Sequence, residues 1–177
     1  ENASREALVR EGQIIYRGNC AYCHGTEGEG GIGLMLNTPD LVGAADEKFL
    51  FASITQGRPT TAMPAWSQLS ARQVTALIRY LQSWDTQSDL RLQSAPRGGD
   101  YALGEVHYKI SCLPCHGEEG RGGVGPQLAN PELLRAASDD LLYHWIGQGR
   151  VGTAMKGFLA EGQGPTTLKP DQVADVI

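Results

Sequence analysis

The sequence of 177 residues lacks any run of 18 or more apolar residues, so no part of it has the composition of a membrane-spanning helix. It also lacks an excess of positive charge, because 15 Lys and Arg face 20 Asp and Glu and the formal net charge is −5. This balance argues against nucleic acid as a partner, since phosphate binding requires clustered basic residues. Cysteine and methionine are scarce, with four and three copies, which makes their positions informative.

The four cysteines lie in two pentapeptides of the same form, C-A-Y-C-H at residues 20–24 and C-L-P-C-H at residues 112–116. A shift of 92 residues superposes the two pentapeptides. At this shift residues 12–66 match residues 104–158 at 24 of 55 positions. The chain is therefore an internal duplication, and a match of this extent predicts that both copies have the same fold.

The duplication predicts two homologous domains, residues 1–90 and 91–177, each with one of the pentapeptides. A linker is expected within residues 85–99, where Ser, Gln, Asp, Pro and Gly gather. By comparison with the first copy, we expect the last helix of the second domain to be cut short at Ile177.

Hydrophobic periodicity predicts helices in each copy. Two sets of residues have helical spacing: Leu8, Gly12, Ile15 and Tyr16, and Val74, Leu77, Ile78 and Leu81. Ser70 and Gln73 have the spacing of a capping box at the start of the second set. A further helix is expected from about Asp46 to just before Gly57, with its counterpart from Ser138 to just before Gly149. No segment alternates as a strand does, so the predicted fold class is all-α.

The pentapeptide C-x-x-C-H is the attachment motif of c-type haem. Positions i and i+3 of a helical turn share a face, so both thiols of one motif can reach the same porphyrin. The predicted attachment residues are Cys20, Cys23, Cys112 and Cys115. His24 and His116 are the expected proximal iron ligands. Met63 and Met155 both occur in a T-A-M context 39 residues after their histidine, and they are the expected opposite ligands.

Three other interpretations of these motifs are disfavoured. A Cys₄ zinc site would need the two cysteine pairs much closer in sequence. A redox dithiol does not explain why a histidine follows both pairs. The loops over residues 28–33 and 120–125 match G-x-G-x-x-G, but a dinucleotide site needs a strand before that loop, and here a cysteine motif precedes it.

The remaining candidate ligands are expected to have structural roles. Met35 lies close to His24 in sequence and corresponds to Gln127 in the other copy, so packing is its expected role. His107 and His144 correspond to an isoleucine and an alanine, which cannot bind iron. An iron bound by His144 in place of Met155 would have two histidine ligands and a lower potential.

Each half of the chain resembles a class I cytochrome c, and the whole resembles the tandem dihaem class I cytochromes c of bacterial respiratory chains. In that family a glycine and an aromatic residue, here Gly12 and Tyr16, let the first and last helices cross closely. The family's G-P-x-L element occurs over residues 125–128, where the proline carbonyl accepts a hydrogen bond from the proximal histidine. The first half has Leu34 at the proline position, and its carbonyl can take the same role.

The resemblance implies two tandem domains, each of a few helices wrapped around one covalently bound haem c. It implies electron transfer without catalytic residues: single electrons pass between redox partners through two His/Met-ligated haems, in a free carrier or in a subunit of a respiratory complex. The acidic balance predicts partners with basic docking surfaces. Haem attachment implies the periplasm or the periplasmic face of the inner membrane, and association with a membrane complex is compatible with the sequence. The alternative is a dihaem enzyme of the peroxidase or thiosulfate-oxidising type with one labile axial ligand.

Overall fold

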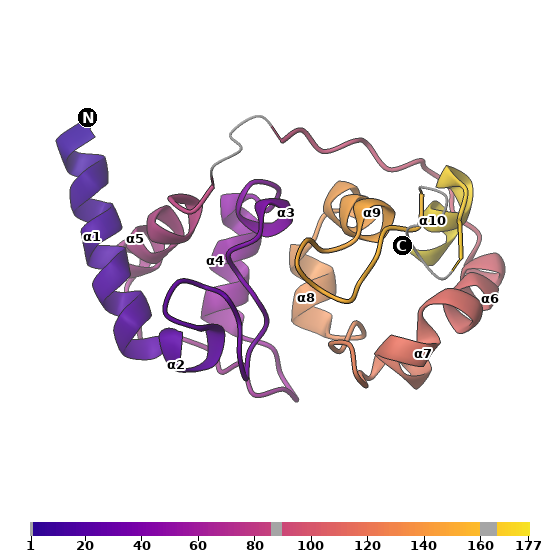
Figure 1. The fold of residues 1–177 in the computed structure, drawn as a ribbon, viewed down its shortest axis with the longest axis horizontal. Helices are drawn as coiled ribbons and strands as arrows, with labels where there is room; N and C mark the ends of the chain where they lie inside the picture. Colours follow the sequence, from indigo (N-terminus) through magenta and orange to yellow (C-terminus); the bar gives the residue numbers. More distant parts are fainter. Residues whose placement is uncertain (1, 86–89, 160–165) are drawn as a thin grey trace. The chain divides into compact units, whose positions relative to one another are not determined.

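The computed structural model of the chain describes residues 2–85, 90–159 and 166–177. Helices joined by turns and irregular loops make up these ranges and no strand occurs in them, so the predicted all-α fold is confirmed. The chain divides into two compact units, residues 1–90 and 91–177 (Figure 1). Part of the predicted linker, residues 86–89, lies outside the described ranges.

The same order of helices occurs in both units. The first unit has α1 (Asn2–Asn19), α2 (Ala21–His24), α3 (Pro39–Val42), α4 (Glu47–Gln56) and α5 (Ala71–Gln82). The second unit has α6 (Tyr101–Ser111), α7 (Leu113–His116), the short 3₁₀ helix η1 (Glu118–Gly120), α8 (Pro131–Ala136), α9 (Asp139–Gln148) and α10 (Pro170–Val176). The short helices α2 and α7 contain the second cysteine and the histidine of each pentapeptide.

Glycines set the close crossing of the first and last helices in each unit. In the first unit α1 and α5 lie side by side (Figure 1), and a Cβ atom on Gly12 would lie 2.0 Å from the carbonyl oxygen of Ala76. In the second unit α6 packs on α10, and a Cβ atom on Gly104 would lie 1.9 Å from the carbonyl oxygen of Asp175. No other residue has room at these two points, because real Cβ contacts are longer than 3 Å.

Helix α5 begins at the predicted capping box. The Ser70 hydroxyl accepts a hydrogen bond from the backbone N–H of Gln73 at 3.3 Å, and the Gln73 side-chain oxygen accepts one from the N–H of Ser70 at 2.9 Å. Two otherwise unpaired N–H groups at the start of the helix are thus satisfied. The apolar face of α5 is buried against α1 and α4.

Helices α4 and α9 begin and end where the sequence predicts. Asp46 and Ser138 cap their first turns through side-chain oxygens. Gly57 and Gly149 end them with φ angles of +63° and +77°. These left-handed angles strain residues with a side chain, so glycine is needed where the chain turns from the helix into the loop that contains the methionine.

Aromatic and aliphatic side chains fill both cores. In the first unit Tyr16 packs against Tyr80 and Trp84, with ring centroids 5.4 and 5.1 Å apart, and Tyr80 lies 5.0 Å from Trp84. The second core contains Tyr143, Phe158, Leu168 and Val173. Trp84 is therefore a packing residue of the first unit, as is usual for a tryptophan in a core.

Candidate haem-attachment sites

Each cysteine motif forms one helical turn, and the two turns have the same geometry. Cys20 precedes α2 with φ −110° and ψ −34°, and Cys112 precedes α7 with φ −112° and ψ −38°. The backbone N–H groups of His24 and His116 both donate to the carbonyl oxygen four residues earlier at 2.9 Å. This spacing presents the two thiols and the imidazole of each motif from a single turn, as attachment to one planar group requires.

A carbonyl ten residues farther along holds the imidazole ring of each motif. His24 Nδ1 lies 2.8 Å from the carbonyl oxygen of Leu34, and His116 Nδ1 lies 2.8 Å from that of Pro126. Since a carbonyl oxygen only accepts hydrogen bonds, Nδ1 carries the proton and the neutral ring has an unprotonated Nε2. Leu34 therefore makes the same bond as the proline that it replaces.

The glycine-rich loops fold back onto the cysteine turns. The same two hydrogen bonds occur in both halves: Gly33 to Cys23 and Gly30 to His24 in the first, Gly125 to Cys115 and Gly122 to His116 in the second, all at 2.7 or 2.8 Å. A Cβ atom on Gly33 would lie 2.8 Å from Cε1 of the His24 ring. A dinucleotide site needs a strand before the loop and loop N–H groups that can bind phosphate. Here a helical turn precedes the loop, and these N–H groups donate to carbonyl oxygens of the cysteine motif.

The four cysteines are free thiols, and burial shifts the pKa of the first cysteine in each pair. Burial, together with the neighbouring Cys23, raises the pKa of the Cys20 thiol to about 11. The pKa of Cys112 is raised to about 11 by burial and by Cys115. Catalytic dithiols need the opposite shift, because the thiolate is the nucleophile. Cys20 and Cys112 therefore lack the lowered pKa of an attacking thiol.

The described residues do not form a zinc site either. Within the part of the chain that the structure describes, no group of three or more His, Cys, Asp or Glu residues comes together in a way that could hold a metal ion. His107 lies on α6 with its Nε2 atom 3.7 Å from Oδ2 of Asp175 on α10. It therefore has a partner in the helix crossing, in keeping with the expected structural role.

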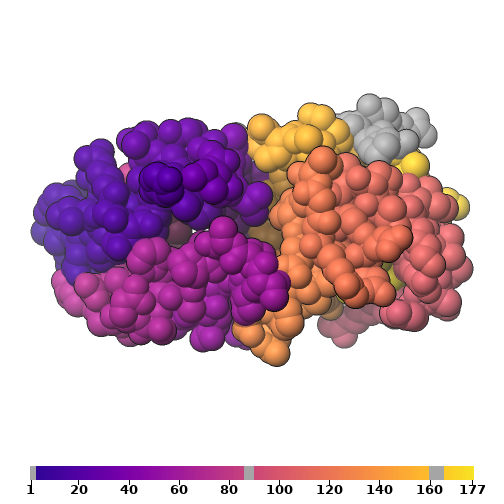
Figure 2. Space-filling view, turned by 90° about the horizontal axis from the view of Figure 1, so that it is seen from below, coloured from indigo at the N-terminus to yellow at the C-terminus, as the bar shows by residue number. Residues whose placement is uncertain are grey.

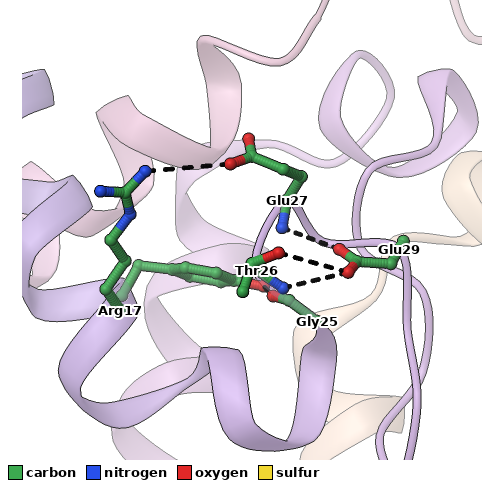
Figure 3. A network of polar contacts seen from close by, with 6 residues as sticks. Arg17, Gly25, Thr26, Glu27 and Glu29 are labelled. Atoms are coloured by element: carbon green, nitrogen blue, oxygen red, sulfur yellow. Dashed lines mark hydrogen bonds and ion pairs between the residues drawn. The ribbon is translucent and has the colours of Figure 1, made fainter.

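A carboxylate stabilises the turn that follows the first motif (Figure 3). The Glu29 carboxylate accepts hydrogen bonds from the N–H of Glu27 at 2.7 Å and from the N–H and hydroxyl of Thr26 at 3.2 and 3.4 Å. Hydrogen bonds from the backbone of Glu29 itself, and then from those of Glu27 and Thr26, lower the pKa of the Glu29 carboxyl. In the second half Arg121 occupies the corresponding position and pairs with Glu119.

The two methionines lie in loops of matching structure after α4 and α9. The N–H of Arg58 donates to the carbonyl oxygen of Met63 at 3.0 Å, and the N–H of Arg150 donates to that of Met155 at 2.8 Å. Both methionines are half-buried. Each thioether thus belongs to a loop closed by its own backbone, which limits the positions that the sulfur can take.

The residues of both halves fit a covalently attached haem. Each half supplies two unlinked thiols and an imidazole whose Nε2 is unprotonated. Ile32 and Val124 occupy the same repeat position, just before the glycine that contacts the histidine ring, and they are 69% and 91% exposed. Large exposed apolar side chains at matching positions suit a flat apolar group lying against them. Figure 2 shows a hollow in the face of the first unit, between its indigo-to-purple part and its magenta part.

Sequence reasoning missed two sets of hydroxyl groups. Tyr16 donates through its hydroxyl to the carbonyl oxygen of Gly25 at 2.7 Å, and Tyr108 donates in the same way to Gly117 at 2.7 Å. The threonine hydroxyls of the two T-A-M segments also donate hydrogen bonds, to the carbonyl oxygens of Arg58 and Arg150 in the same loops. A signal was present, because Tyr16 is identical to Tyr108 and Thr61 to Thr153 in the aligned copies.

The two helical units define the class of the protein. Each has a first and last helix that cross at a glycine, a C-x-x-C-H turn and a carbonyl-bound histidine, and together they form a tandem dihaem class I cytochrome c. The model of the family described as "Cytochrome C oxidase, cbb3-type, subunit III" matches residues 7–81 and again residues 99–177. The chain belongs to this family, and the two haem c groups expected from the motifs follow from the two matches.

Two similar proteins are both described as the FixP subunit of a cbb3-type cytochrome c oxidase. The chain is 27% identical over 166 residues to the cbb3-type cytochrome c oxidase subunit FixP of Rhizobium etli, covering 85% of this chain and 54% of that protein. It is 31% identical over 182 residues to FixP of Bradyrhizobium sp., covering 92% and 59%. The chain thus spans little more than half the length of these relatives. None of the helices described above has the length and apolar character needed to traverse a lipid bilayer.

Proposed function

We propose that the chain is the dihaem electron-transfer part of a cbb3-type oxidase subunit, which passes single electrons between protein redox partners. The observation that carries the proposal is the identical bond of His24 and His116 to a backbone carbonyl at 2.8 Å. This bond fixes the ring orientation, leaves Nε2 as the atom that would bind the iron, and would raise the basicity of that nitrogen. An identical arrangement in both halves supports the same task for both.

One haem c in each unit supplies a one-electron iron couple when it is bound. Cys20 and Cys23 would hold the porphyrin of the first unit, and Cys112 and Cys115 that of the second. His24 and Met63 would bind one iron, and His116 and Met155 would bind the other. Two protein ligands on each iron would close it to a substrate, which favours electron transfer over catalysis.

The partners that we propose are redox proteins with basic docking surfaces, met at the periplasmic face of the inner membrane. The net charge of −5 supports this choice, because charges of opposite sign steer association. The relatives are named as oxidase subunits, which supports an oxidase as the acceptor. Electron-transfer rates with such a partner should fall as salt is added, and rates independent of salt would contradict this choice of partner.

The axial ligands are tested on the purified holoprotein by a reduced-minus-oxidised spectrum with redox titration. The mass should show two haems, and the ferric protein should have the weak near-infrared band of methionine-ligated iron. Met63→Ala and Met155→Ala should each remove part of this band and lower one of the two potentials. Met35→Leu is the matched control and should leave the band and both potentials unchanged.

Two outcomes would contradict the proposal. A colourless protein or a mass without two porphyrins would remove the haem sites altogether. Ferric protein that binds cyanide or peroxide readily before any substitution would indicate an open iron position, and it would favour the dihaem enzyme.

A further inference from the structure

Each methionine loop is bridged by one threonine hydroxyl. In the first unit the Thr61 hydroxyl donates to the carbonyl oxygen of Arg58 at 2.7 Å and accepts a hydrogen bond from the N–H of Met63 at 3.2 Å. In the second unit the Thr153 hydroxyl makes the same two bonds, at 2.8 and 3.2 Å. The hydroxyl thus joins the start of the loop to the backbone of the methionine, as one group that both donates and accepts.

The two loops keep this geometry although their sequences differ. Pro59 and Thr60 of the first loop correspond to Val151 and Gly152 of the second. The φ angles of Thr60 and Gly152 are +68° and +76°, so both loops turn through a left-handed residue at the same point. In the first loop a β-branched residue adopts an angle that is a genuine outlier for its type. Tolerance of that strain indicates that the shape of the loop matters.

We propose that Thr61 and Thr153 are positioning residues for the thioether ligands: their hydroxyls fix the backbone of Met63 and Met155, so that the sulfur remains in place for the iron. The proposal rests on the proposed function, since it presumes that the methionines are the ligands. It adds that the position of each methionine sulfur depends on a hydroxyl two residues earlier in the chain. Neither threonine needs to touch the haem for this role.

The chemistry of the bridge defines the variants that test it. Valine has the shape of threonine without the hydroxyl, so Thr61→Val removes both hydrogen bonds and preserves the volume. Serine retains the hydroxyl, so Thr61→Ser should rescue the loop. Thr55→Val is the matched control, because the Thr55 hydroxyl donates to the helical carbonyl of Phe51 at 2.8 Å, within α4 and outside the methionine loop.

The measurement is the affinity of the ferric holoprotein for cyanide or imidazole, which must displace the methionine, together with the near-infrared band. Loss of the two hydrogen bonds that hold the methionine backbone should raise the affinity of one haem for cyanide or imidazole on the order of tenfold. Thr61→Val should affect one haem and Thr153→Val the other. The serine variants and Thr55→Val should bind like the parent protein. Thr61→Ala serves as a second hydroxyl-free variant in case valine disturbs folding.

The outcomes separate the two proposals. If the unsubstituted protein has no methionine band, the proposed ligands are wrong and the positioning role is overturned with them. If the parent has the band and the valine and alanine variants bind cyanide no more tightly than the parent, only the positioning role is overturned. A serine variant that behaves like valine would also overturn it, since the hydroxyl would then not be the acting group.

Discussion

The Tyr16 hydroxyl donates a 2.7 Å hydrogen bond to the carbonyl oxygen of Gly25, the residue directly after His24. The second unit repeats the bond between Tyr108 and Gly117 at the same length. A side chain on the first helix of each unit thus holds the end of the cysteine turn. Burial raises the pKa of both tyrosines, so the hydroxyls remain protonated and able to donate at neutral pH.

Tyr16→Phe and Tyr108→Phe should lower the free energy of unfolding of their own unit by about 1 kcal/mol, the usual net contribution of one hydrogen bond. They should also shift the reduction potential of the haem in that unit, because the turn that contains the histidine loses its hydrogen bond to the first helix. Chemical denaturation of the holoprotein, followed by far-ultraviolet circular dichroism, and redox titration measure the two effects.

Tyr80→Phe is the matched control in the first unit. Tyr80 is buried, and its hydroxyl has no hydrogen-bond partner among the described residues. Removing a buried hydroxyl without a partner should leave stability unchanged or raise it, because the desolvation cost of the group disappears. Equal losses of stability for Tyr16→Phe and Tyr80→Phe would show that packing of the ring edge, and not the bond to Gly25, is responsible.

The helix crossing gives a second prediction. Gly12→Ala and Gly104→Ala should destabilise their units by about 1–3 kcal/mol, since the added Cβ atoms would lie about 2 Å from backbone oxygens of the last helix. Gly18→Ala is the control on the same helix, because a Cβ atom there meets nothing within 4 Å. It should raise stability by about 0.5–1 kcal/mol through helix propensity alone. Thermal and chemical unfolding of the three variants would measure this, and a destabilising Gly18→Ala would contradict the explanation.

Local sequence signals predicted much of the fold. The starts of α4, α5 and α9 follow from side chains that bond to N–H groups within the next few residues, at Asp46, Ser70 and Ser138. Their positions need no information from the rest of the chain. The length of α1 was not apparent, since its apolar face covers only residues 8–16, while the first turns are polar and include an exposed Arg10–Glu6 pair.

The contacts that complete each site could not be predicted, because they join residues that the fold brings together. The motif gave the cysteines and histidines by spacing alone. The bond from Tyr16 to Gly25 depends on the angle between α1 and the cysteine turn. The threonine bridge at Thr61 depends on a left-handed residue at Thr60, which no propensity rule favours. The G-x-G-x-x-G pattern likewise gave no sign that Gly33 lies directly against the histidine ring.

The strained residue of the first methionine loop gives a third prediction. Thr60→Gly should raise the free energy of unfolding by about 1 kcal/mol, because glycine adopts the φ angle of +68° without steric cost. The second unit already has Gly152 at this position, with φ +76°, so Gly152→Thr should lower stability by a similar amount. Chemical denaturation of the pair measures both effects. A loss of stability in Thr60→Gly would show that the threonine side chain contributes more than its backbone strain costs.

The acid response of the first unit gives a fourth prediction, from the network in Figure 3. The pKa of Glu29 lies below its ordinary value of 4.5 in the folded protein, because backbone N–H groups donate to the ionised carboxylate. A carboxyl group with a lowered folded pKa contributes stability above its unfolded pKa and loses it as the pH falls through the folded pKa. Glu29→Gln should therefore be less stable than the parent at pH 7, and the difference should shrink once the pH falls below 4.5.

Glu27→Gln is the control for this prediction in the same loop. Glu27 pairs with Arg17 at 3.9 Å with both side chains well exposed, and such pairs contribute little to stability. Chemical denaturation of the holoprotein across a pH series from about 3 to about 7 compares the three proteins. The parent and Glu27→Gln should have parallel curves, whereas the Glu29→Gln curve should converge with them at acid pH. A gap between the parent and Glu29→Gln that stays constant over the whole series would mean that the ionised carboxylate is not what holds this turn.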